Sequence, residues 1–159
     1  MKKAFTMIEL IFVIVILGIL SSVAISKMAV TRDDAQITKG RAQVAAIRNA
    51  IVLMRNTNML QAKGAKWPSA LDDAGTGEGQ ELFDGNSTIG TLLDYPLYAK
   101  NSNGNWMKTA VMAADESKYA FNVANVAIEF KYNKKTGKFD CNHNDSDATK
   151  KKYCKALTE

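Results

Sequence analysis

The chain has 159 residues, of which 47% are hydrophobic and 23% are charged, and its formal net charge is +5. These values exclude wholesale disorder and a membrane protein of many spans, and the length suits one domain. One histidine, His143, and two cysteines, Cys141 and Cys154, are too few for the usual metal enzymes or Cys/His nucleophiles. We therefore expect a protein that is not an enzyme, with no catalytic residue, no cofactor and no metal.

The most apolar stretch is the 22-residue run from Phe5 to Ser26, in which Glu9 is the only charged residue. As a helix it would be roughly 33 Å long, enough to cross a hydrocarbon core of about 30 Å. Two lysines precede the run, which predicts a cytoplasmic N-terminus and an exported remainder. A cleaved secretory signal is the alternative, with its cleavage site among the small residues around Ala24. A carboxylate within a membrane helix is costly, so Glu9 needs a partner or a purpose.

The helical pattern continues past Ser26 to about Leu60 without a proline or a glycine pair, which predicts one helix of roughly 80 Å. The second half of this helix is amphipathic, because apolar or small residues recur at steps of three and four. We place three arginines, spaced by seven residues, on the opposite face. The stripe consists of Ile37, Gly40, Val44, Ile47, Ile51 and Met54, and the arginines are Arg41, Arg48 and Arg55.

Residues 2–25 resemble the N-terminal signature of type IV prepilins and type II secretion pseudopilins: a short basic leader, a small residue, then F-T-x-x-E-L and an apolar helix. The resemblance implies cleavage by prepilin peptidase between Ala4 and Phe5, and N-methylation of the new Phe5 amine. It also implies that Glu9, with Thr6 of the same motif, serves assembly by pairing with the N-terminal amine of a neighbouring subunit. Such a pair would set register more than it adds stability, because burying both charges is costly.

Two positions depart from the family pattern. Ala4 stands where the family nearly always has glycine. We still expect cleavage by the peptidase, at a slower rate. Ser26 stands where many relatives have proline, so no backbone hydrogen bond is removed there. The one soft point that could melt locally in a filament is then near Gly18, beside Ser21 and Ser22.

After the helix, the composition predicts a small head that begins with loops. Trp67-Pro68 follows the helix, and an aromatic-proline pair at this point also occurs in pseudopilins. Residues 72–90 are rich in glycine and polar residues, and the GTGEG segment within them lacks the Lys-Ser/Thr of a phosphate-binding loop. We expect a flexible turn there, a short helix or strand at 91–99, and another turn at 101–105.

Alternating apolar residues predict strands at 119–123 and 126–132, a hairpin loop at 133–137 and a returning strand at 138–141. We expect an antiparallel meander packed on the amphipathic half of the helix. The predicted fold class is therefore α+β, similar to type IV pilins. The predicted segments are a leader (1–4), a transmembrane and filament-core half-helix (5–26), an amphipathic half-helix (27–62) and a periplasmic head (63–159).

Cys141 and Cys154 are separated by twelve residues near the C-terminus. In an exported chain a disulfide is the default, and closing this loop would stabilise by roughly 3 kcal/mol in the chain-entropy model. Free thiols or a metal-binding pair are the alternatives. A C-terminal disulfide loop is a feature of type IV pilins that many major pseudopilins lack, so it favours the pilins.

The same loop offers alternating oxygen ligands, and major pseudopilins often bind calcium near the C-terminus. The spacing begins like an EF-hand loop, but Lys151 occupies the twelfth position instead of glutamate. We favour a solvated polar loop, with His143 exposed. The oxygen-bearing residues are Asp140, Asn142, Asn144, Asp145 and Asp147.

The segment between residues 131 and 155 contains eight lysines and only three aspartates. Such a cluster could contact DNA phosphates nonspecifically, but no aromatic residues interleave in a stacking pattern. We favour a solvated face. The lysines are Lys131, Lys134, Lys135, Lys138, Lys150, Lys151, Lys152 and Lys155.

These observations favour a structural protein, a pseudopilin that polymerises through its N-terminal helix for type II secretion or DNA uptake. The alternatives are a pilin of a surface fibre for adhesion, twitching or DNA capture, and a membrane-tethered binding domain that does not polymerise. The expected partners are further copies in a helical filament, prepilin peptidase, an inner-membrane assembly platform, and minor pilins or pseudopilins. The expected location is the bacterial inner membrane in a single pass, with the head in the periplasm, and then a filament.

Overall fold

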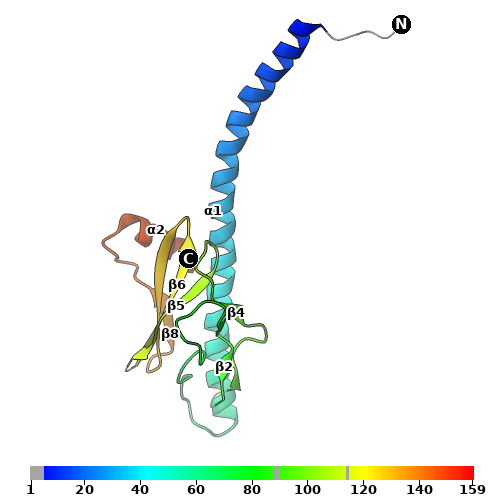
Figure 1. The fold of residues 1–159 in the computed structure, drawn as a ribbon. Helices are drawn as coiled ribbons and strands as arrows, with labels where there is room; N and C mark the ends of the chain where they lie inside the picture. The colour runs from blue at the N-terminus through cyan, green and yellow to red at the C-terminus, as the bar shows by residue number, and fades with distance from the viewer. Residues whose placement is uncertain (1–5, 88–89, 114) are drawn as a thin grey trace. The chain divides into compact units, whose positions relative to one another are not determined.

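The computed structural model describes residues 6–87, 90–113 and 115–159 (Figure 1). A long helix, α1 (Met7–Leu60), precedes a set of antiparallel strands, and a second helix, α2 (Ala148–Thr158), follows them. The chain divides into two units, with the division between Ala35 and Gln36. The layout confirms the predicted α+β class, with a long N-terminal helix and an antiparallel-sheet head.

In the first unit, every residue from Thr6 to Ile25 is exposed. The span Met7–Ile25 has a mean hydropathy of 2.8, and it is long and apolar enough to cross a membrane. Its polar groups are satisfied within the helix: the Ser21 hydroxyl donates to the Leu17 carbonyl oxygen at 2.7 Å. The helix runs through Gly18 without a break. Apolar side chains thus surround this segment, and none is buried by the described part of the chain.

In the second unit, the predicted stripe of α1 is the core face of the helix. Val44, Ile47 and Ile51 are at most 1% exposed. Gly40 lies where the helix is packed tightly against the sheet and α2, because a Cβ atom built there would come within 3.0 Å of the Phe121 and Leu157 side chains. Periodicity alone located this face correctly.

Four antiparallel strands form the main sheet, in the order β5 (Trp106–Ala113), β6 (Glu116–Val123), β7 (Val126–Asn133) and β8 (Lys138–Cys141). Ala124 and Asn125, both with positive φ, form the two-residue turn between β6 and β7. Strand β5 was not predicted, because Lys108 is one of its inward residues and interrupts the apolar alternation.

Two short ribbons lie in the chain segment that connects α1 to the main sheet. Strand β1 (Glu81–Leu82) pairs with β4 (Leu97–Tyr98), and β2 (Gly85–Asn86) pairs with β3 (Gly90–Thr91). The strand alternative for 91–99 is therefore correct, although only Thr91, Leu97 and Tyr98 adopt it. The other described residues of 72–87 are irregular, as the composition predicts.

Helix α2 was also missed from sequence, where a polar disulfide loop was expected. Asp147 caps it, since its side chain accepts the backbone N–H groups of Thr149 and Lys150. The helix is short and lysine-rich, and only Cys154 and Leu157 are buried. Two buried residues are too few to produce a periodic signal.

An aromatic cluster fills the space between the sheet, the loops and α1. Its rings lie with centroids 4.6 to 6.0 Å apart, mostly tilted or edge-on. The α1 stripe belongs to the same core, so the meander packs on the amphipathic helix as expected. The aromatic residues are Phe83, Trp106, Tyr119, Phe121, Phe130 and Phe139.

Candidate functional site

The N-terminal motif places Thr6 and Glu9 at the start of α1. The Glu9 N–H donates to Thr6 Oγ1 at 3.3 Å, and the Thr6 N–H donates to Glu9 Oε2 at 3.5 Å. This reciprocal pair is a capping box, in which a hydroxyl and a carboxylate three residues apart satisfy backbone N–H groups at a helix start. The sequence contained the signal, because T-x-x-E before an apolar run is the capping-box pattern.

The carboxylate of Glu9 therefore has a partner within its own chain. Its position in the first helical turn also suits a negative charge, because the helix dipole is positive at that end. The bond from Thr6 is long and both residues are exposed. A charged donor from outside the chain could replace it, since charge-assisted bonds are shorter and stronger. Ala4 and Phe5, the predicted cleavage and methylation positions, lie outside the described residues.

The three arginines of α1 contact the head, so their placement on the face opposite the stripe was wrong. Each arginine directly follows a stripe residue, and a helix turns about 100° per residue, which puts it at the edge of the stripe. There each guanidinium donates to a backbone carbonyl of the head. The contacts are Arg41 to the Ala156 oxygen at 2.7 and 2.9 Å, Arg48 to the Phe139 oxygen at 3.0 Å, and Arg55 to the Ala65 oxygen at 3.4 Å.

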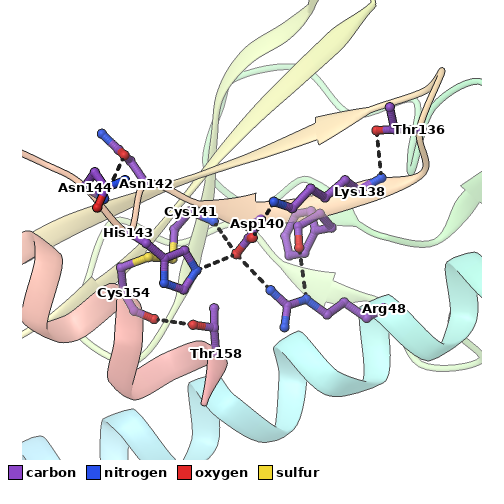
Figure 2. Close-up of polar contacts among 11 residues, drawn as sticks. Arg48, Thr136, Lys138, Asp140, Cys141, Asn142, His143, Asn144, Cys154 and Thr158 are labelled. Carbon is purple, nitrogen blue, oxygen red and sulfur yellow. Dashed lines mark hydrogen bonds and ion pairs between the residues drawn. A yellow bond between two sulfur atoms is a disulfide. The ribbon is translucent and has the colours of Figure 1, made fainter.

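Cys141 and Cys154 form a disulfide with a Cα–Cα distance of 5.8 Å (Figure 2). Cys141 ends β8 and Cys154 lies within α2, so the bond ties the C-terminal helix to the edge of the sheet. Both residues are buried. The structure therefore contains the disulfide that the exported context favours.

Asp140 is the centre of a polar cluster beside the disulfide (Figure 2). It hydrogen-bonds with Arg48 at 2.9 Å, and with His143 and Lys138 at 3.1 Å each. Burial by itself raises the pKa of Asp140, but the hydrogen bonds from Lys138, His143 and the Cys141 N–H, together with the charge of Arg48, hold it below 3.8. His143 is therefore half-buried and engaged, whereas the sequence analysis predicted an exposed residue.

The other oxygens of this loop serve the backbone. Asn142 Oδ1 accepts the Asn144 N–H at 3.1 Å, and Asp145 Oδ1 accepts the Asp147 N–H at 2.9 Å. With Asp147 used as the α2 cap, these side chains form turns instead of converging on one point. The geometry supports the interpretation as a solvated polar loop over a calcium loop.

The lysine cluster separates into two groups. Four lysines form ion pairs with exposed or half-buried acids, and the other four lie on α2 and are exposed. This division is typical of a solvated face. The pairs are Lys131 with Glu129, Lys134 and Lys135 with Asp115, and Lys138 with Asp140.

A buried ion pair between Asp72 and Lys108 had no signal in the sequence. Lys108 Nζ lies 2.6 Å from Asp72 Oδ1 and donates to the Ala74 carbonyl oxygen at 2.8 Å. Asp72 Oδ2 accepts the Tyr119 hydroxyl at 2.9 Å and the Phe83 N–H at 3.0 Å. Burial, and then the charge of Asp72, raise the pKa of Tyr119, so its phenol remains a donor. The network anchors the irregular 72–83 segment to β5 and β6.

Comparison with known proteins adds one finding at the N-terminus. Residues 1–25 match the family model described as the prokaryotic N-terminal methylation motif. No curated protein and no solved structure matches the chain. The matched residues include Thr6 and Glu9, whose capping box opens an exposed apolar helix. Through residues 1–25 the chain therefore carries the prepilin motif of type IV pilins and pseudopilins.

Proposed function

We propose that the protein is a structural subunit of a type IV filament-like assembly, a pseudopilin that serves type II secretion or DNA uptake, and not an enzyme. One observation carries the proposal: within the residues that match the prepilin motif, a helix of membrane-spanning length exposes apolar side chains all round. In the membrane, lipid would cover these side chains. In a filament, the same segments of neighbouring subunits would cover them.

Processing would create the charge that assembly needs. Cleavage between Ala4 and Phe5 would leave a new amine at Phe5, and methylation of this amine keeps its positive charge. The amine of one subunit would then displace the Thr6 N–H from the Glu9 carboxylate of its neighbour. In a low-dielectric core such a charge pair is strong, and an unmatched carboxylate is costly, so the pair would select one register between subunits.

The expected partners follow from this sequence of processing and assembly. Prepilin peptidase would act on residues 4–5, and an inner-membrane assembly platform would extract the helix from the bilayer. Minor pilins or pseudopilins would start the filament. The subunit would reside in the inner membrane in a single pass, with its head in the periplasm, before it joins the filament.

A pilin of a surface fibre is the second candidate, and the Cys141–Cys154 disulfide favours it. A fibre outside the cell meets proteases and mechanical load, and a cross-link at the C-terminus opposes local opening of α2. Recovery of the subunit from fibres sheared off the cell surface would favour the pilin. Its retention in the periplasm would favour the pseudopilin.

The test is intact-mass analysis of the full chain extracted from membranes of cells with and without prepilin peptidase. We expect a chain that begins at N-methylated Phe5 only when the peptidase is present. A chain beginning after Ala24 would identify a secreted domain and overturn the proposal. A chain still beginning at Met1 in the presence of the peptidase would leave a simple membrane tether.

Assembly is tested separately by cross-linking between subunits in the same cells. Glu9→Ala should abolish cross-linked oligomers while the chain still enters the membrane. The matched control is Glu129→Ala, which removes an exposed carboxylate from the head. Equal oligomer formation by Glu9→Ala and the unmodified chain would support the tether that does not polymerise.

A further inference from the structure

We propose that the reduced C-terminal loop is a binding site for one thiophilic divalent cation of the Zn²⁺ class, held by Cys141, His143 and Cys154. The geometry points to this site because one ligand atom from each of the three residues lies within 4.8 Å of the other two. They are also the only histidine and the only two cysteines of the chain. The inference concerns the head alone and does not depend on filament assembly.

The three ligand atoms need little movement to bind a metal. With Zn–S bonds of about 2.3 Å and Zn–N bonds of about 2.0 Å, ligand atoms in a tetrahedral site lie roughly 3.5–3.8 Å apart. Separation of the two sulfurs to that distance, with a small shift of the imidazole, would produce the site. His143 lies in the loop after β8, and Cys154 lies near the middle of the short helix α2, so both can adjust without unfolding the sheet.

The imidazole of His143 already has a hydrogen-bond partner at one of its two nitrogens. Its Nε2 lies 3.1 Å from Asp140 Oδ1, which leaves Nδ1 as the nitrogen free to bind a metal (Figure 2). A carboxylate that holds the second nitrogen of a ligating histidine fixes the tautomer and increases the basicity of the ligand. Asp140 is in turn held by Arg48 at 2.9 Å. The site therefore has three ligands and a carboxylate, itself held in place, that would fix the orientation of the histidine ligand.

The surroundings suit a three-ligand site with one open position. Cys154 is 1% exposed and Cys141 8% exposed, so the two thiolates would be shielded from solvent, while the His143 side chain is 35% exposed. A pocket of about 200 Å³ is lined in part by Asn142, Asp145 and Cys154, and it would offer the ion a path to Cys154. Water would complete the coordination.

Metal and disulfide exclude one another, because the sulfur atoms ligate only as thiolates. A phosphine reductant cleaves the S–S bond: phosphorus is oxidised to the phosphine oxide with the oxygen of one water, and that water's two hydrogens go to the two sulfurs. The cation then displaces both thiol protons, which enter solution. In a chain not yet oxidised, the ion would hold the end of β8 to α2 as the disulfide does later.

The experiment is a Co²⁺ titration of the full chain in detergent micelles, after phosphine reduction and anaerobic removal of the phosphine. We expect one Co²⁺ per chain, with the visible bands of tetrahedral thiolate-bound cobalt, and their loss when one equivalent of Zn²⁺ is added. The oxidised chain should give no bands. Asp140→Asn should weaken Co²⁺ binding by about 10–100-fold, as is typical when the residue that hydrogen-bonds to a metal-ligating histidine is changed. His143→Ala should weaken it at least as much.

Asn144→Ala is the matched control, since Asn144 is exposed in the same loop, and its binding should equal that of the unmodified chain. Circular dichroism follows folding in each sample. The proposal is overturned if the folded reduced chain shows no tetrahedral bands, or if His143→Ala binds as tightly as Asn144→Ala. If the reduced chain unfolds without metal, Zn²⁺ should restore its folded spectrum, and failure to do so overturns the proposal equally.

Discussion

Two segments of the same helix differ in what their side chains contact. From Met7 to Ile25, α1 is apolar on all sides and every residue is exposed. From Val44 to Met54, the head buries one apolar stripe of the helix, and the apolar side chains off the stripe, Val52 and Leu53, are exposed. The backbone hydrogen bonds are of the same kind in both segments. The first segment is therefore suited to surroundings outside the chain, whereas the second is specific to this fold.

The polar groups of the two segments differ in the same way. In the first segment Thr6, Glu9 and Ser21 bond to groups within four residues along the helix. In the second segment, side chains bond to groups far along the chain. The Arg48 guanidinium donates to the Phe139 carbonyl oxygen at 3.0 Å, for example. Both tryptophans of the sequence lie in the head, so tryptophan fluorescence reports on the head alone.

The largest effect on head stability is expected from Lys108→Met. It leaves the Asp72 carboxylate buried without its cation, and breaking a buried ion pair in this way costs about 3–5 kcal/mol. Denaturant unfolding followed by tryptophan fluorescence measures the loss. Lys118→Met removes an exposed partner 3.6 Å from Glu129 and should cost under about 1 kcal/mol. Similar losses in the two variants would contradict the structural role of the buried pair.

The matched pair Ile47→Ala and Leu17→Ala tests the comparison directly. Ile47 is fully buried, and truncation of such a residue costs about 2–5 kcal/mol. Leu17 is 56% exposed, so its truncation should leave the fluorescence-detected unfolding unchanged. Carbonate extraction of the same membranes shows whether each chain is inserted. A Leu17 variant with a destabilised head would show that the first segment also supports the head.

Two glycines of α1 provide a smaller contrast. Gly40→Ala pushes a methyl group into Phe121 and Leu157, and overpacking of this kind costs about 1–3 kcal/mol. Gly18 has no heavy atom within 4 Å of a built Cβ, and alanine favours a helix over glycine by about 1 kcal/mol. Gly18→Ala should therefore cost nothing in head stability. Unfolding curves of the two variants would refute this contrast if they coincided.

The smallest effect is a pH dependence from Asp140. Its pKa in the folded chain is held below 3.8, so its ion pairs stabilise the head above that value, and this stabilisation is lost as the pH falls through the folded pKa. We expect Asp140→Asn to reduce the loss of head stability at acidic pH, measured by unfolding between about pH 6 and pH 2. An unchanged acid dependence would show that other carboxylates dominate.

Local sequence patterns were sufficient to predict many of the structural elements of this protein. The sequence by itself determined the long helix, its two kinds of surface, the strands from Tyr119 to Cys141 and the prepilin motif, because each depends on periodicity or on residues close along the chain. The Thr6–Glu9 capping box could also have been predicted, since both partners lie within one helical turn.

Contacts between polar groups that lie far apart along the chain were visible in the tertiary structure alone. The Asp72–Lys108 pair spans 36 residues, and Arg48 meets Asp140 across 92. The buried side chain of Lys108 interrupts the apolar alternation of β5, so the pattern did not predict this strand. Helix α2 depends on a disulfide and two buried residues. The physical reason is that a buried charge or a short polar helix is stable only with partners that folding supplies, and no local pattern records those partners.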